Sequence, residues 1–312
     1  MTTTTATTPT MRETFARTVT EAMDTDPRVA IVLAEISRDL FADTALRHPD
    51  RVINVGIREQ LMVSVGGGLA LAGMRPVVHS YGPFLVERPF EQIKLDLGHQ
   101  DVGAVLVSIG GSYDDPVWGR THQVPGDIAL LDTLPGWTVH SPGHPAELIR
   151  PLRAALAGDD RVYLRLSTRS NAQPYARGTE LAILREGRRG VVLAVGTTAD
   201  AVLAATEGAD VTVLYAATVR PFDGPGLRRA VAGADRADVV LVEPYLRGTS
   251  APHVSDALAD LPHRLRSLGV RRDREIHAYG TPEDHDAAHG LDPAGIATAI
   301  RAFLGNPGGP TW

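Results

Sequence analysis

Residues 54–70 read NVGIREQLMVSVGGGLA, and this stretch decides the fold. A short apolar run just before it, residues 51–54, predicts a strand, and the stretch itself predicts a long helix that begins near Glu59. The helix dipole favours a glutamate in the first turn. Three adjacent glycines, residues 66–68, each cost about 1 kcal/mol relative to alanine inside a helix. We therefore expect a close neighbour against this helix: a packed element, another subunit or a cofactor.

Short runs rich in Val, Leu and Ile alternate with helix-like segments along the rest of the chain. Runs without polar alternation suit a parallel sheet that is buried on both faces. Their alternation with helices predicts an α/β fold with parallel sheets. The expected strands are residues 29–34, 77–80, 102–108, 139–141, 162–166, 191–195, 211–215 and 239–242. The expected helices are residues 11–23, 59–72, 87–97, 146–157, 200–207, 225–232 and 293–304.

Polar loops between residues 171 and 189 interrupt this rhythm, and a second α/β rhythm starts after them. We therefore predict two domains, over residues 11–175 and 190–304, in line with about 100–200 residues per domain. The Thr-rich start, residues 1–10, is expected to be a disordered lead-in and not a secretory signal. The Pro- and Gly-rich end, residues 305–312, is expected to be a loose tail.

Composition excludes several classes of function. The chain has 31 Lys and Arg against 37 Asp and Glu, a net charge of −6, which argues against general nucleic-acid binding because that requires a basic face. No apolar run approaches the ~20 residues of a membrane helix. The absence of cysteine excludes disulfides, a thiol nucleophile, zinc–thiolate sites and iron–sulfur clusters. We expect a cytoplasmic protein.

Three further stretches place chemically active side chains where predicted strands end. They read HSYGPFLVERPFEQI (residues 79–93), WGRTHQVPGDIALL (118–131) and YLRLSTRSN (163–171). Each has an ordinary explanation on its own, since aromatic rings usually pack in cores and a guanidinium often forms a surface salt bridge. Their order along the chain is more specific than any single stretch.

Taken in order over about residues 11–304, these stretches resemble the C-terminal half of transketolases and of deoxyxylulose-phosphate synthases. In the second domain, TVRPFD (218–223), VEPYLRG (242–248) and LDPAGI (291–296) resemble turns and the closing helix of the same family. The resemblance implies a thiamine-diphosphate-binding pyrimidine domain, with a parallel sheet and helices on both faces. A smaller α/β transketolase C-terminal domain would follow it.

The resemblance also assigns roles to individual residues. Glu59 matches the family glutamate that contacts N1′ of the aminopyrimidine and promotes loss of the thiazolium C2 proton. Tyr81 and Phe84 match the aromatic residues that hold the pyrimidine ring, whereas Arg88 is expected to be structural. His122 matches the histidine that contacts the donor sugar and can move protons on it.

A substrate-phosphate contact is also implied. Arg169 matches the family arginine at this place best, and Arg165 is the second choice; the planar guanidinium suits bidentate contact with phosphate. Two positions depart from the family, which usually has acidic residues where this sequence has Trp118 and Gly126. The family's aspartate hydrogen-bonds a sugar hydroxyl, and the Trp118 indole cannot accept such a bond. The nearby acids at positions 114 and 115 could substitute.

The family holds the Mg²⁺ of thiamine diphosphate on a Gly-Asp-Gly motif followed by Asn-Asn, and this sequence contains no such motif. The nearest strings, at residues 125–128 and 157–160, belong to the histidine loop and to a surface turn. The resemblance therefore implies a partner chain that carries the metal ligands, and an α2β2 heterotetramer. The apolar face of the Glu59 helix would pack against its copy or the partner.

The implied reaction is transfer of a two-carbon ketol unit from a ketose, usually phosphorylated, to an aldose acceptor. Two alternatives stay open. One is the β subunit of a 2-oxoacid dehydrogenase E1 component, which shares the fold and the glutamate. The other is a non-catalytic scaffold paralogue, for which Trp118 and Gly126 are the main support. A fused deoxyxylulose-phosphate synthase is disfavoured because a domain is missing.

Overall fold

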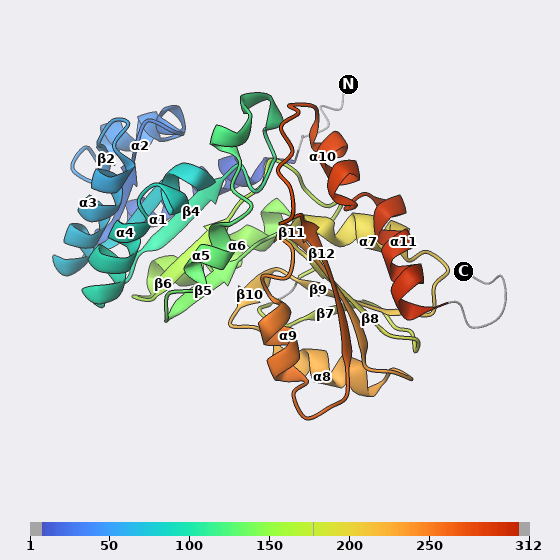
Figure 1. Ribbon diagram of the computed structural model, residues 1–312. Helices are drawn as coiled ribbons and strands as arrows, with labels where there is room; N and C mark the ends of the chain where they lie inside the picture. The colour runs from blue at the N-terminus through green and yellow to red at the C-terminus, as the bar shows by residue number, and fades with distance from the viewer. Residues whose placement is uncertain (1–7, 177, 306–312) are drawn as a thin grey trace, which may run out of the picture.

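The computed structural model describes residues 8–176 and 178–305, which form two α/β units lying side by side (Figure 1). The lead-in and tail predicted from the sequence lie mostly outside these residues. Within them, the Thr10 hydroxyl accepts a hydrogen bond from the Glu13 N–H and caps the first helix. In the part of the chain that the structure describes, no helix has the length and apolar character needed to cross a membrane.

The first sheet has seven strands in the order β10-β5-β6-β4-β3-β1-β2. All neighbouring pairs are parallel except β10 and β5. The parallel strands therefore end at one edge, where active sites of such sheets usually form. The strands are β1 (Val29–Leu33), β2 (Val52–Asn54), β3 (Arg75–Tyr81), β4 (Val105–Ile109), β5 (Trp137–His140), β6 (Arg161–Arg165) and β10 (Thr218–Arg220). The helices of this unit are α1 (Met11–Thr25), η1 (Arg38–Phe41), α2 (Ala42–Arg47), α3 (Glu59–Leu71), η2 (Pro83–Glu87), α4 (Phe90–Gln92), η3 (Ile93–His99), η4 (Pro116–Trp118), η5 (Arg120–His122), α5 (Asp127–Leu131) and α6 (Pro145–Ala157).

Successive residues of these strands face two separate hydrophobic cores, as a pleated sheet requires. Val77 lies in the core formed with α1 and α6, whereas its neighbour Val78 lies in the core formed with α3 and η3. The α/β class and the buried parallel sheet predicted from the sequence are thereby confirmed. Helix α3 packs on one face of this sheet and α6 packs on the other.

The glycines of α3 allow close packing, as the sequence predicted. A Cβ at Gly66 would lie 2.7 Å from the Val78 side chain, and one at Gly67 would lie 2.6 Å from the Asp96 carbonyl oxygen. The neighbours are thus β3 and η3. Gly68 has no atom of the described residues within 4 Å of such a Cβ, so this side of the helix faces outward.

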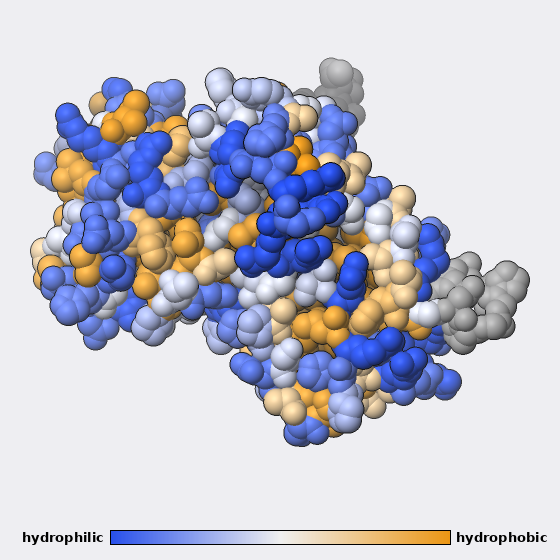
Figure 2. Space-filling view, viewed as in Figure 1, coloured by the Kyte–Doolittle hydropathy of each residue, from blue (hydrophilic) through white to orange (hydrophobic). Residues whose placement is uncertain are grey.

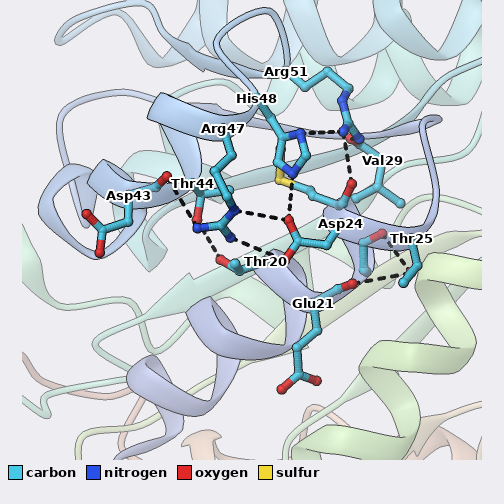
Figure 3. A network of polar contacts seen from close by, with 12 residues as sticks. Thr20, Glu21, Asp24, Thr25, Val29, Asp43, Thr44, Arg47, His48 and Arg51 are labelled. Atoms are coloured by element: carbon cyan, nitrogen blue, oxygen red, sulfur yellow. Dashed lines mark hydrogen bonds and ion pairs between the residues drawn. The ribbon is translucent and has the colours of Figure 1, made fainter.

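Polar contacts fasten the end of α1 to α2 (Figure 3). The Asp24 carboxylate contacts His48 Nε2 at 2.6 Å and accepts hydrogen bonds from the Arg47 guanidinium, and these two contacts lower the Asp24 pKa. Arg51 donates to the carbonyl oxygens of Met23, Asp26 and Val29. These bonds satisfy backbone acceptors where α1 ends and β1 begins.

The second sheet has five strands in the order β12-β11-β8-β9-β7. Helices α8 and α9 share the core on one face, and α7 and α11 share the core on the other. The strands are β7 (Ala182–Arg185), β8 (Val191–Val195), β9 (Thr212–Ala216), β11 (Asp238–Leu246) and β12 (Arg264–Val270). The helices are η6 (Gly196–Thr198), α7 (Ala199–Ala205), α8 (Gly224–Ala232), α9 (Ala251–Ala257), α10 (Pro282–His289) and α11 (Pro293–Leu304).

One strand that follows β9 in the chain joins the first sheet. β10 follows β9 in the chain, yet it pairs antiparallel with β5 at the edge of the first sheet. The last residue of this strand, Arg220, pairs with Asp132. Because β10 is only three residues long, the sequence gives no periodicity by which to predict it.

One helix is expected over residues 87–97, but residues 83–99 instead form three segments, η2, α4 and η3. Of these, η2 and η3 have π-helical hydrogen bonding. Pro83 opens η2, and Pro89 precedes α4. Because proline lacks an N–H and clashes with the preceding turn, it interrupts a regular α-helix. π-Helical turns are frequent at functional sites.

Buried histidines make the fold sensitive to acid. Burial lowers the pKa of His79 from 6.5 to about 3 and that of His140 to about 4. The unfolded chain therefore takes up protons below pH 6.5 that the folded chain does not, and stability falls as the pH drops from 6.5. We expect the free energy of unfolding to fall by up to about 1.4 kcal/mol per pH unit for each such histidine.

Urea unfolding at pH 7.5, 6.5 and 5.5 measures this slope. His79→Gln should reduce it, whereas His99→Gln, at an exposed position, should leave it unchanged. Equal slopes in the two variants would contradict the assignment to His79.

Candidate active site

Glu59 is a buried carboxylate at the start of α3. Its side chain is 3% exposed, although Ile57 just before it is 73% exposed. Arg58, the N-cap residue, makes no capping hydrogen bond through its side chain. Glu59 Oε1 pairs with Arg88 Nη1 at 2.7 Å, and the Arg88 guanidinium lies 4.3 Å from the centre of the Phe84 ring. The carboxylate is therefore held at the positive end of the helix dipole, next to a cation and an aromatic face.

Three rings form a cluster beside this ion pair. The Phe84 ring centre lies 5.0 Å from that of His122 and 6.3 Å from that of Tyr81, and Tyr81 lies 5.5 Å from His122. Tyr81 ends β3, Phe84 lies in η2, and His122 lies in η5. Edge-to-face contacts of this kind fix the ring orientations. Glu59, Tyr81, Phe84 and His122, all selected from the sequence, thus lie together at the carboxyl edge of the first sheet.

The histidine loop carries two more polar contacts. Thr121 Oγ1 lies 3.0 Å from His122 Nδ1. The other ring nitrogen, Nε2, makes no hydrogen bond to a described residue and could contact a ligand. The Tyr81 hydroxyl donates a hydrogen bond to Asp115 at 3.3 Å. Burial is the main cause that raises the Tyr81 pKa, and the negative charge of Asp115 raises it further. Trp118 lies 5.7 Å from the His122 ring, and 62% of its surface is exposed.

The two acids proposed to replace the family's aspartate have different environments. Asp115 lies against Tyr81, at the edge of the ring cluster. Asp114 is buried, and its carboxylate accepts hydrogen bonds from the Ser167 hydroxyl and the Thr168 N–H. Burial raises the Asp114 pKa in spite of Arg169 nearby. Asp115 is therefore the acid with better access to a ligand at this cluster.

Arg165 lies inside the first unit. Its side chain is 3% exposed, its Nε donates to Asp127 at 2.7 Å, and its Nη2 donates to Ser112 at 2.7 Å. The Tyr163 hydroxyl also donates to Asp127 at 2.7 Å, and burial raises the Tyr163 pKa well above its ordinary value. These contacts already use the guanidinium of Arg165. The sequence analysis named this residue as the second choice for contact with the substrate phosphate.

Arg169 contacts the second unit. Its Nη1 and Nη2 donate to the two oxygens of Asp286 in α10, at 2.5 and 3.2 Å. The Tyr113 hydroxyl donates to the same carboxylate at 2.7 Å. Burial would lower the Arg169 pKa, but Asp286 holds it above its ordinary value. A substrate phosphate at Arg169 would have to compete with this carboxylate.

Sequence reasoning did not select the partners of these arginines. Asp127 was noted only within a motif, and Asp286 and Tyr113 were not noted. Asp286 is 117 residues from Arg169 along the chain, so no local pattern connects the two. Among residues 8–176 and 178–305, no group of three or more His, Cys, Asp or Glu side chains could hold a metal ion.

A sequence profile described as the transketolase pyrimidine binding domain matches residues 7–173. This chain belongs to the transketolase family. A 33.6 kDa protein of the fasciation locus of Rhodococcoides fascians, named as uncharacterized, is 58% identical to it and covers 93% of this chain and 94% of its own length. A 6-deoxy-6-sulfo-D-fructose transketolase subunit of Clostridium sp. (strain MSTE9) is 30% identical over 84% of each chain.

Other transketolase-family proteins are about twice as long. The 1-deoxy-D-xylulose-5-phosphate synthase of Alkalilimnicola ehrlichii is 33% identical over 93% of this chain but only 47% of the synthase. Among solved structures, a split gene transketolase described as an inactive β4 tetramer has a TM-score of 0.82 at 22% identity, over 96% of this chain and 99% of that one. The chain thus corresponds to one half of the fused transketolase-family proteins, and the fold predicted from the sequence is confirmed.

Proposed function

We propose that this chain is the pyrimidine-binding half of a thiamine-diphosphate-dependent transketolase. In this proposal it transfers a two-carbon ketol unit from a ketose to an aldose, and it is active only with a partner that supplies the diphosphate and Mg²⁺ site. The relative from Clostridium is named as a transketolase subunit, and the split gene transketolase covers the same length of chain. Both support the assignment to a split enzyme.

One observation carries the proposal: the buried Glu59 carboxylate lies at a helix start, beside an aromatic pair and a histidine. An aminopyrimidine fits this group of residues chemically, because a carboxyl group can hydrogen-bond a ring nitrogen while Phe84 and Tyr81 contact the ring face. When bound, thiamine diphosphate supplies the nucleophilic carbon and the electron sink of the reaction. Glu59 would hold a proton at the pyrimidine nitrogen, and His122 would move protons on the sugar.

An apolar surface next to the site fits a partner chain. Ile57, two residues before α3, is 73% exposed, and Leu61 and Leu71, within α3, are 44% and 60% exposed. Leu95 of η3 is 41% exposed. Figure 2 shows apolar side chains on this side of the molecule, where Figure 1 places α3 and α4. Exposed apolar groups around a cofactor-binding carboxylate suit a subunit interface. We propose that this surface of α3 lies at a subunit interface of an α2β2 assembly.

Calorimetric titration of thiamine diphosphate with Mg²⁺ tests the split site. The chain alone is compared with the chain co-purified with a candidate partner that carries Gly-Asp-Gly. We expect tight binding only in the complex, and loss of that binding in Glu59→Ala. A stable complex that binds no cofactor would overturn the catalytic proposal and favour a scaffold.

The substrate-phosphate role of Arg169 is tested separately. In the assembled enzyme, Arg169→Gln should raise the KM for a phosphorylated ketose about 10–100-fold, since a charged hydrogen bond contributes about 1.5–3 kcal/mol. The KM for the same ketose without phosphate should change little. Asp286→Asn should lower the KM for the phosphorylated ketose, because a competing carboxylate is removed. Equal changes for both donors in Arg169→Gln would contradict the phosphate role.

A further inference from the structure

A cavity of about 510 Å³ lies beneath α6, away from the candidate active site. α6, β5 and β6 form its walls. Ala217 and Thr218, where β10 begins, close one side, and Ala176, Gly178 and Thr179, from the segment between β6 and β7, close another. An occupant would therefore contact the first unit, the start of β10 and the segment between β6 and β7.

The cavity belongs to the sheet face opposite α3. Val162, which lines it, is part of the core under α1 and α6, whereas the next residue, Tyr163, faces the α3 side. Arg75 is two residues from Val77 on β3 and therefore points to the same face as Val77. Arg75 begins this strand and Tyr81 ends it, so the two are about 20 Å apart at ~3.3 Å per residue. A ligand here would not overlap with one at Glu59.

Arg75 lines this cavity and is a buried cation with incomplete pairing. Its side chain is 1% exposed, and Nε donates to the Ala155 carbonyl oxygen at 2.9 Å at the end of α6. Among the described residues, Nη1 and Nη2 have no hydrogen-bond partner. Burial lowers the Arg75 pKa, and the charges of Asp159 and Asp160 oppose this. A buried guanidinium with four free N–H donors is costly unless an acceptor reaches it.

The remaining lining suits a small organic anion. Arg150 adds a second positive charge, and Thr138 adds a hydroxyl group. The one buried acid in the lining, Glu147, already accepts hydrogen bonds from the Gly143, Tyr175 and Ala176 N–H groups and from the Tyr215 hydroxyl. The other walls are mainly alanine, proline and valine side chains, which match a carbon skeleton.

We propose that this cavity binds a small organic molecule through an oxyanion group, phosphate or carboxylate, that Arg75 holds. The guanidinium fork matches two oxygens of either group. Nη1 and Nη2 are shielded from solvent in this conformation, so the proposal requires the turn at residues 158–160, in which Asp159 and Asp160 are exposed, to move aside and admit the oxyanion. Gly158 and Asp160 of this turn line the cavity.

Thermal unfolding of the full chain at constant ionic strength tests the site, with inorganic phosphate and malonate as probes and chloride as the reference. At saturation, the preferred probe should raise Tm by about 2–4 °C. A larger rise with phosphate assigns a phosphorylated ligand, and a larger rise with malonate assigns a carboxylate. No rise with either probe would overturn the proposal.

Variants locate the effect. Arg75→Lys keeps the charge but loses the fork, and the rise in Tm should fall by at least half. Ala154→Trp, at an exposed lining position, should block entry, and Arg150→Ala should weaken binding. Arg153→Ala, on the same helix but paired with Glu21 outside the cavity, is the matched control and should behave as the unchanged chain. If Ala154→Trp responds to the probe as strongly as Arg153→Ala does, the anion binds elsewhere and the proposal is wrong.

Asp160→Asn distinguishes the site from an internal ion pair. If Arg75 binds an external anion, removing the negative charge of Asp160, which lines the cavity, should strengthen binding of the probe several-fold. If Asp160 is instead the partner of Arg75 in solution, Asp160→Asn will lower the Tm of the free chain and the probes will not restore it. That result would overturn the proposal.

Discussion

Replacing Glu59 by glutamine is expected to lower turnover of the assembled enzyme by about 10²–10⁴-fold, the usual range for loss of a group that transfers a proton in catalysis. Glutamine has nearly the same shape, so α3 should keep its start and its packing. It cannot hold an acidic proton, and it does not form a charged pair with Arg88, which lies 2.7 Å from Glu59. Steady-state kinetics with a ketose donor measure the loss.

The control is Glu91→Gln, which makes the same chemical change at an exposed position in α4. It should leave turnover unchanged. Circular dichroism and co-purification with the partner should show that both variants fold and assemble. If Glu59→Gln retains turnover while it remains assembled, Glu59 is not the proton-transferring acid, and the transketolase proposal loses its central residue.

The sequence could predict this cluster because its members follow strand ends. Tyr81 ends β3, and His122 follows β4, and parallel strands bring their carboxyl ends to one edge. Glu59 likewise comes after the carboxyl end of a parallel strand, β2, and so lies at the same edge. The motif order therefore predicts the placement of these residues before any side-chain contact is known.

Side-chain partners could not be predicted in the same way. Arg165 and Asp127 are 38 residues apart, and Arg169 and Asp286 are 117 residues apart. The first pairing depends on how β6 meets α5, and the second depends on how the segment after β6 meets α10 of the other unit. No local spacing in the sequence records either contact. For the same reason β10 was missed: its pairing with β5 comes from the meeting of the two units and not from its own short sequence.

Asp127→Ala is expected to destabilise the fold by about 3–5 kcal/mol, because it leaves the Arg165 guanidinium buried without its counter-charge. Arg165 is 3% exposed and Asp127 is fully buried, so water cannot replace the lost contact. The Tyr163 hydroxyl would lose its acceptor as well. Urea unfolding measures the loss, and Glu21→Ala is the control, since it removes an acid from the exposed Glu21–Arg153 pair and should change stability little.

The double variant Asp127→Leu with Arg165→Met separates the charge from the packing. Replacing both members of a buried pair by apolar groups costs less than removing one, so this variant should be more stable than Asp127→Ala. If Asp127→Ala instead costs no more than Glu21→Ala, the pair is not maintained in solution. Arg165 would then be available to a substrate phosphate, and its effect should appear in the KM for a phosphorylated ketose and not in the free energy of unfolding. The free energy of unfolding and the KM together therefore decide which of Arg165 and Arg169 stabilises the fold and which contacts the substrate.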